Sequence, residues 1–194
     1  MDSYKTITDS VGEGYYTEKR SKFFAYAHHI HSVEDVKALQ QKYKKQYYDA
    51  RHVCYAYRLG PDGAEFRAND DGEPSSTAGK PILGVMLSRE VSDVAIFVIR
   101  YYGGVNLGTG GLIVAYREAA QDAMEHAEIV EQLVEEELTY TFSYPMMNSV
   151  MRVVKELQPR IVNQQFDNTC SITLAIRKSE MLRLKSALEK LTFE

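Results

Sequence analysis

The sequence has little cysteine, no long apolar run and no excess of positive charge, and each shortage argues against a class of protein. Its two cysteines, Cys54 and Cys170, lie far apart and show no CxxC or zinc-finger spacing. We therefore expect two small core residues in a reducing compartment. No stretch approaches the roughly 18 apolar residues of a membrane span. The first ten residues lack the basic and apolar regions of a secretory signal, so we expect a cytoplasmic protein without a membrane partner.

The charge balance argues against a nucleic-acid binder that is basic over its whole surface. The 194 residues include 23 Lys and Arg and 27 Asp and Glu, for a net charge of −4. This balance leaves a local basic patch open, because net charge carries no information on distribution. The length suits one large domain or two small ones.

Residues 1–131 are predicted to alternate between strands and helices. Ser32 occupies an N-cap position with Asp35 three residues later, which predicts a helix over about 33–47 after a strand at 21–30. The six apolar residues at 94–99 suit a strand that is covered on both faces. Further strands are expected at 52–59, 64–68 and 128–133, and helices from Pro81 and over about 111–126.

Residues 132–194 show a different pattern of apolar and polar residues. Leu138, Tyr140 and Phe142 alternate with polar residues, as in a half-buried strand. A helix from Pro145, strands at 160–166 and 169–176, and a helix capped by Ser179 complete a β-α-β-β-α order, with at most a stub of a last strand at 191–194. This order is typical of a ferredoxin-like fold. We therefore predict an α+β protein with domains at 1–131 and 132–194.

The segment "RYYGGVNLGTGGLIVAY" contains five glycines and leads into a predicted helix. They are Gly103, Gly104, Gly108, Gly110 and Gly111. Glycines before a helix can bring backbone N–H groups to an anion, or can form a tight corner between strand and helix. The segment has neither the Walker A sequence nor the G-x-G-x-x-G spacing of a dinucleotide site. Both interpretations stay open.

Three carboxylates, Asp70, Asp71 and Glu73, cluster in "NDDGEPSSTAGKP". Such a cluster can bind a hard cation or transfer protons, but Asp and Gly are also turn residues. The EF-hand pattern is missing, and no third ligand is specified by spacing for His29 and His31. We expect no metal, no cofactor and no catalytic residue here, and carboxylates that shape the loop or offer acceptors.

Two motifs together resemble the paired signatures of the YigZ/IMPACT family. They are "DDGEPSSTAGKPIL" and "RYYGGVNLGTGGLIVAY", and they are preceded by "YYDARHVCYAY" and "EKRSKFFAYA". The resemblance covers nearly the whole chain and is most specific through residues 49–120. Three positions depart from the family pattern: Ser76 replaces a glycine, Asn106 a lysine and Val114 an arginine.

The resemblance implies an N-terminal domain similar to ribosomal proteins and domain IV of elongation factor G, and a C-terminal domain similar to domain V of that factor. Eukaryotic members of the family regulate translation. We therefore expect a non-enzymatic protein that binds RNA, the ribosome or a translation-associated protein. The expected contacts are Lys80, Arg100, Gly103, Gly104, Gly108, Gly110 and Gly111, with Asp70, Asp71 and Glu73 beside them. The alternative is an enzyme acting on a phosphorylated small molecule, with Asp71 or Glu73 as general base.

Overall fold

The structure is a computed structural model that describes residues 1–192, and it divides into two compact units. The first unit is Tyr4–Gln132, and the second unit joins Met1–Ser3 to the described residues from Leu133 onward. Both units mix helices with strands, so the expected α+β class is confirmed. None of the described helices has the length and apolarity to cross a membrane.

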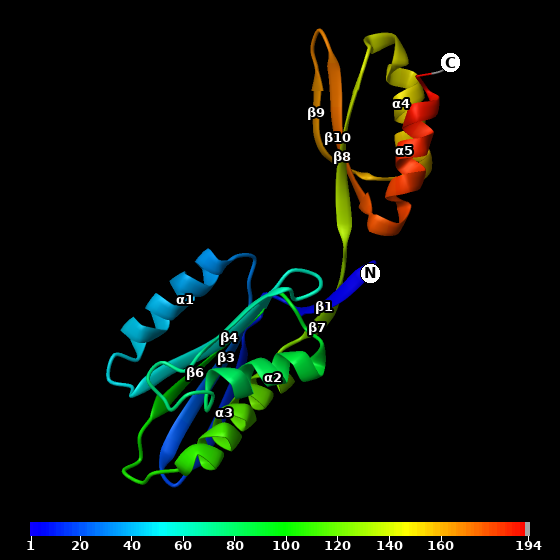
Figure 1. Cartoon of the computed structure of the whole chain (residues 1–194). Coiled ribbons are helices and arrows are strands. Elements are labelled where there is room, and N and C mark those ends of the chain that lie inside the picture. The colour runs from blue at the N-terminus through cyan, green and yellow to red at the C-terminus, as the bar shows by residue number, and fades with distance from the viewer. Residues whose placement is uncertain (193–194) are drawn as a thin grey trace. The chain divides into compact units, whose positions relative to one another are not determined.

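The first unit is built on a five-stranded antiparallel sheet of order β2-β3-β6-β4-β5. The strands are β2 (Gly12–Glu18), β3 (Ser21–His29), β4 (His52–Leu59), β5 (Glu65–Asn69) and β6 (Val94–Tyr101). Helices α2 (Gly79–Arg89) and α3 (Gly108–Glu125) lie on one face of this sheet, and α1 (Val33–Gln46) lies on the other (Figure 1). A smaller two-stranded sheet pairs β1 (Ser3–Ile7) with β7 (Ile129–Leu133).

The central strand β6 explains why the sheet is covered on both faces. Its residues from Val94 to Arg100 are all buried, as the apolar run predicted. On one face, Ile96 and Val98 pack with the alanines of α3 at 115, 119 and 123. These small side chains allow a helix to lie close to the strands. The expected strands at 21–30, 52–59 and 94–99 are confirmed.

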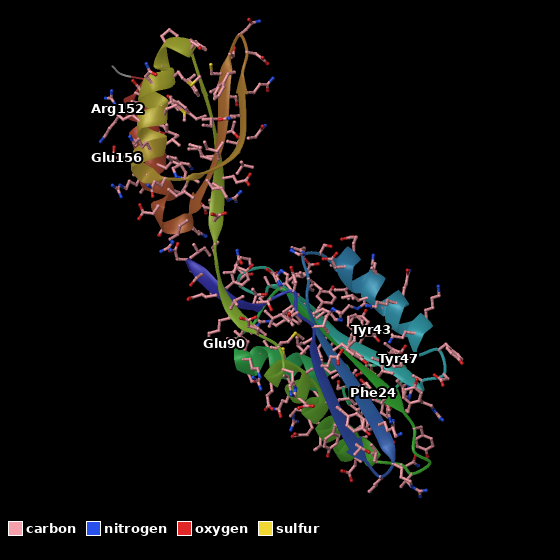
Figure 2. All side chains as sticks on the ribbon, turned by 180° about the vertical axis from the view of Figure 1, so that it is seen from behind. Phe24, Tyr43, Tyr47, Glu90, Arg152 and Glu156 are labelled. Carbon is pink, nitrogen blue, oxygen red and sulfur yellow. The ribbon has the colours of Figure 1, made fainter. Side chains whose placement is uncertain are left out.

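The opposite face is rich in aromatic side chains. Tyr43 of α1 and Tyr47, which directly follows α1, point toward the sheet, where Phe24 lies on β3 (Figure 2). The rings of Phe24 and Tyr47 are stacked with centroids 6.3 Å apart. The N-cap prediction for α1 is confirmed, because the Asp35 backbone N–H donates to Ser32 Oγ at 3.3 Å. Two helices begin earlier than predicted: α2 at Gly79 and α3 at Gly108.

The second unit forms an antiparallel sheet of order β8-β10-β9, with two helices on one face (Figure 1). Its elements are β8 (Glu135–Phe142), η1 (Tyr144–Met146), α4 (Met147–Leu157), β9 (Arg160–Phe166), β10 (Cys170–Arg177), η2 (Lys178–Glu180) and α5 (Met181–Lys190). Ile172 and Leu174 on β10 are fully buried and pack against Val150 of α4 and Leu184 of α5. Alternation along the strands therefore buries one face of this sheet, as predicted.

Ser179 does not cap α5, so that prediction was wrong. Ser179 lies inside η2, and its backbone N–H and hydroxyl both donate to the Asp2 carboxylate, at 3.0 and 3.1 Å. Asp2 also accepts a hydrogen bond from the Val134 backbone N–H through its carbonyl. A residue near the chain start, rather than a local hydroxyl, thus holds this turn. The predicted strand stub at 191–194 falls partly outside the described residues, and Leu191 and Thr192 end α5 in a turn.

Candidate anion-binding cleft

A cleft of about 380 Å³ opens where β4 begins, β6 ends and α3 begins. The loop between β5 and α2 closes its remaining side. The lining residues are Arg51, His52, Glu73, Pro74, Arg100, Tyr102, Asn106, Leu107, Gly108, Thr109 and Leu112. Both signature segments therefore contribute to one hollow, which lies within the first unit.

Glu73 is the buried acceptor at the base of this cleft. Its side chain is only 3% exposed, and its Oε1 accepts hydrogen bonds from Arg100 Nη1 at 2.5 Å and from the Tyr116 hydroxyl at 2.7 Å. His52 Nε2 lies 3.6 Å from the same oxygen. A buried carboxylate with paired donors is held in a fixed place. Glu73 therefore fixes the positions of Arg100 and Tyr116.

Tyr116 and Cys54 extend this network into the core. The Cys54 thiol lies 3.4 Å from the Tyr116 hydroxyl, to which it donates. Burial raises the pKa of both groups far above their ordinary values. The tyrosine therefore stays a neutral hydrogen-bond donor to Glu73, and the thiol stays protonated and unreactive. Both cysteines are free and buried, as expected.

Two guanidinium groups share one aromatic ring in the cleft. The Arg51 guanidinium lies 5.0 Å from the Tyr102 ring centroid and that of Arg100 lies 5.6 Å from it. Arg100 also approaches the Phe23 ring at 5.7 Å, and its buried Nε has no hydrogen-bond partner within residues 1–192. The negative face of an aromatic ring attracts a cation, and this attraction helps a guanidinium group to stay charged where it contacts less water. Because Arg51 is exposed, its charge is available to a ligand.

The start of α3 adds backbone donors to these cations. Helix α3 has 18 residues, no side-chain cap at Leu107 and no acidic residue in its first turn. The first N–H groups of such a helix lack intrahelical acceptors and lie at the positive end of its dipole. Gly108 and Thr109 place these groups at the cleft wall. The combination of an uncapped helix start and the exposed Arg51 suits an anion, whereas the charge of Arg100 is already paired with Glu73.

Asp70 and Asp71 shape the loop. Asp70 Oδ1 accepts hydrogen bonds from the Ala78 and Gly79 N–H groups at 3.2 and 2.9 Å, which caps α2. Asp71 Oδ2 accepts from the Val53 N–H at 2.7 Å, and its carbonyl oxygen lies 2.6 Å from His52 Nδ1. Two of the three predicted carboxylates thus hold the loop to its neighbours, and only Glu73 lines the cleft.

The predicted glycines serve different purposes. A Cβ at Gly103 would lie 2.2 Å from the Arg20 carbonyl carbon, so this position is a tight corner that excludes side chains. Gly108 has a φ of +72°, a left-handed conformation at the cleft wall that favours glycine. Gly104 also has a positive φ, and Gly110 and Gly111 line a separate hollow beside Tyr16 and Val114. The tight-corner interpretation therefore applies to Gly103, and anion contact at the other glycines stays a prediction.

Lys80 does not join Arg100. It lines a groove between α2 and α3 that shares no residue with the cleft. The structure thus distributes the predicted binding residues over separate hollows.

The structure also brings in residues that the sequence interpretation missed, namely Arg51, His52, Tyr102 and Tyr116. Arg51 and His52 belong to "YYDARHVCYAY", a segment that supports the family resemblance but in which neither residue was assigned a role from the sequence. Within residues 1–192, no three His, Cys, Asp or Glu side chains are arranged to hold a metal ion.

Comparisons with known proteins show the family to which the signature segments belong. The model of the Impact N-terminal domain matches residues 19–124. IMPACT family member YvyE of Bacillus subtilis is 34% identical over 158 residues, covering 81% of this chain and 72% of that protein. An IMPACT family member of Haemophilus influenzae is 33% identical and covers 88% and 84%. A solved structure described as a hypothetical protein has a TM-score of 0.77 at 28% identity and covers 98% and 93%.

Proposed function

The chain belongs to the IMPACT family, and we propose that it is a non-enzymatic protein that binds RNA phosphate in this cleft as part of translation or its regulation. One observation carries the proposal. The exposed Arg51 lies over the Tyr102 ring beside the uncapped start of α3, within one cleft of about 380 Å³ in which Glu73 already pairs with Arg100. This arrangement offers a phosphate both charge and backbone donors.

RNA suits the cleft better than a free inorganic anion does. Tyr102 is 40% exposed, so its ring can stack with an unpaired base while Arg51 contacts the adjoining phosphate. The net charge of −4 on the chain limits binding to this local patch. We expect modest affinity that falls as salt rises, because phosphate contacts release bound counterions.

The link to translation, cytoplasmic residence and the ribosome as the source of the RNA are inferred from the family resemblance. The same resemblance supports the finer fold assignments that we propose. The domain at 1–131 is similar to domain IV of elongation factor G, and the domain at 132–194 is ferredoxin-like and similar to domain V. The order β8-α4-β9-β10-α5 in the second unit supports the latter assignment.

The second candidate is an enzyme that acts on a phosphorylated small molecule. It is favoured by one feature, the buried carboxylate of Glu73 beside an anion-binding cleft. Against it, Glu73 Oε1 already accepts hydrogen bonds from Arg100 and Tyr116, an arrangement that suits positioning better than proton transfer. Release of phosphate from phosphorylated metabolites, lost on Glu73→Gln with the cleft still folded, would favour the enzyme.

The test is fluorescence anisotropy of a labelled 12-nucleotide single-stranded RNA across a salt series, with the full chain and with 70S ribosomes as a second probe. The matched variants are Arg51→Ala in the cleft and Arg67→Ala on β5, both exposed arginines. Arg51→Ala should weaken binding and lower the salt slope by about one unit, whereas Arg67→Ala should leave both unchanged. No binding at low salt, or equal effects of the two variants, would overturn the proposal.

A further inference from the structure

A second hollow, larger than the cleft, lies between α2 and α3. It has a volume of about 660 Å³ and is lined by Ser76, Lys80, Pro81, Leu83, Gly84, Val85, Leu87, Ser88, Ile113, Arg117 and Gln121. Most of these residues are apolar or small. Leu87 at its edge is 52% exposed, and Leu83 and Ile113 are partly exposed beside it. Apolar side chains exposed beside one hollow often mark an interaction site.

The charged side chains that line this groove are all positive. Lys80 from α2 and Arg117 from α3 are its charged lining residues, and none of the carboxylates in the described part of the chain lines it. Neither cation forms an ion pair or hydrogen bond with a residue in the described range 1–192. On a chain whose net charge is −4, two unpaired cations at an apolar groove are complementary to carboxylates on a partner.

Gly84 opens the groove to a close approach. It lies in the middle of α2, where an exposed glycine costs about 1 kcal/mol relative to alanine. A Cβ at this position would meet no atom within 4 Å, so the fold itself does not require glycine there. Because Gly84 has no side chain, a segment of another protein has room to lie across α2 at this position.

We propose that this groove binds an amphipathic helix of a partner protein, with an apolar face toward Leu83, Leu87 and Ile113 and carboxylates toward Lys80 and Arg117. Two neighbouring helices with an apolar groove between them provide the surface that an amphipathic helix covers. RNA fits this site less well, because no aromatic ring lines the groove for a base to stack on.

This proposal is independent of the cleft. The two hollows share no lining residue, so loss of RNA binding leaves peptide binding unaffected, and the reverse also holds. We take the partner to be a different protein, because each of the helices α1 to α5 packs its apolar face within its own unit. The two sites would allow the chain to hold RNA and a protein at the same time.

The test begins with a display library of random 16-residue peptides, selected on the full chain and counter-selected on Lys80→Glu/Arg117→Glu. The selected peptides should share apolar residues at i, i+3, i+4 and i+7 and carry an excess of Asp and Glu. Synthetic copies are then measured by fluorescence anisotropy against the wild type and the variants. An excess of Lys and Arg in the selected peptides, or no selected peptide that distinguishes the variant, would overturn the proposal.

Two matched pairs of variants locate the binding. Lys80→Glu/Arg117→Glu should weaken peptide binding about tenfold or more, whereas the same reversal on α1, Lys37→Glu/Lys45→Glu, should change it less than about twofold. Gly84→Phe should block the groove, whereas Gly84→Ala should keep most of the binding and raise stability. Far-UV circular dichroism and a cooperative urea transition confirm that each variant is folded. Binding that survives Gly84→Phe would contradict the proposed site.

Discussion

The two units differ in what their cores contain. Within residues 1–192, every buried polar or charged side chain lies in the first unit, and the core of the second unit consists of apolar side chains and Cys170. The polar members are Thr6, Ser21, His28, Glu73, Thr77, Ser92 and Arg100. Buried charges lose their hydration, so an ion pair in a core is weak support for stability. Among the described residues, the first unit thus buries an ion pair at its cleft, whereas the second unit buries no charged side chain.

The largest effect should come from breaking the buried ion pair of the first unit. Glu73→Gln leaves the Arg100 guanidinium buried without a counter-charge, and should lower the free energy of unfolding by about 3–5 kcal/mol. Urea unfolding followed by circular dichroism measures the loss. The matched control is Glu135→Gln, which breaks the exposed pair with Arg160 in the second unit and should leave the midpoint unchanged. Equal midpoints for the two variants would show that the buried pair is no more important than the surface one.

A core truncation should have a comparable or slightly smaller effect, confined to the second unit. Leu174→Ala removes a fully buried side chain from β10 and should cost about 2–5 kcal/mol. Hydrogen exchange read by mass spectrometry should rise in peptides from 133–192 and stay constant in peptides from 4–132. Leu182→Ala, at a side chain that is 76% exposed, is the control and should change neither. Faster exchange in both units would mean that they unfold together.

Loss of the cap on α2 should have a moderate effect within the first unit. Asp70→Ala leaves three backbone N–H groups, those of Ser76, Ala78 and Gly79, without their acceptor and should cost about 1–2 kcal/mol. Exchange should rise most at the start of α2. Asp70→Asn keeps one side-chain oxygen and should recover part of the loss. An Asn variant as unstable as the Ala variant would argue for charge rather than capping.

A further effect concerns pH, is absent at neutral pH and should appear in the first unit, because all five histidines lie there. Burial, followed by the charge of Lys42, lowers the pKa of His28 from 6.5 to about 4. Between these values the unfolded chain binds a proton that the folded chain resists, so the free energy of unfolding falls as pH falls from 6.5 to 4. His28→Gln should flatten this slope in urea midpoints at pH 7.0, 5.5 and 4.5. Parallel curves for variant and wild type would contradict the assignment.

Sequence patterns predicted most elements of both units because those patterns are local. The Ser32 cap and the apolar run at 94–99 each depend on residues a few positions apart. The helix α1 and the strand β6 that they predict are both present. Strands β1 and β2 had no such signal, since glycine and charged residues interrupt them. The Ser179 prediction failed because the acceptor that holds this turn, Asp2, lies 177 residues away.

The chain sequence by itself determined the alternation of helices and strands, the two signature segments and the family. It could not distinguish Glu73 from Asp70 and Asp71, because all three are carboxylates within four positions of one loop. Only the tertiary structure distinguishes them. The Asp70 carboxylate accepts a hydrogen bond at the start of α2, and the Asp71 carboxylate accepts one from β4. The Glu73 carboxylate is buried between Arg100 of β6 and Tyr116 of α3. The physical reason is that burial and charge pairing depend on which strands and helices converge, and those contacts join residues 27 and 43 positions apart.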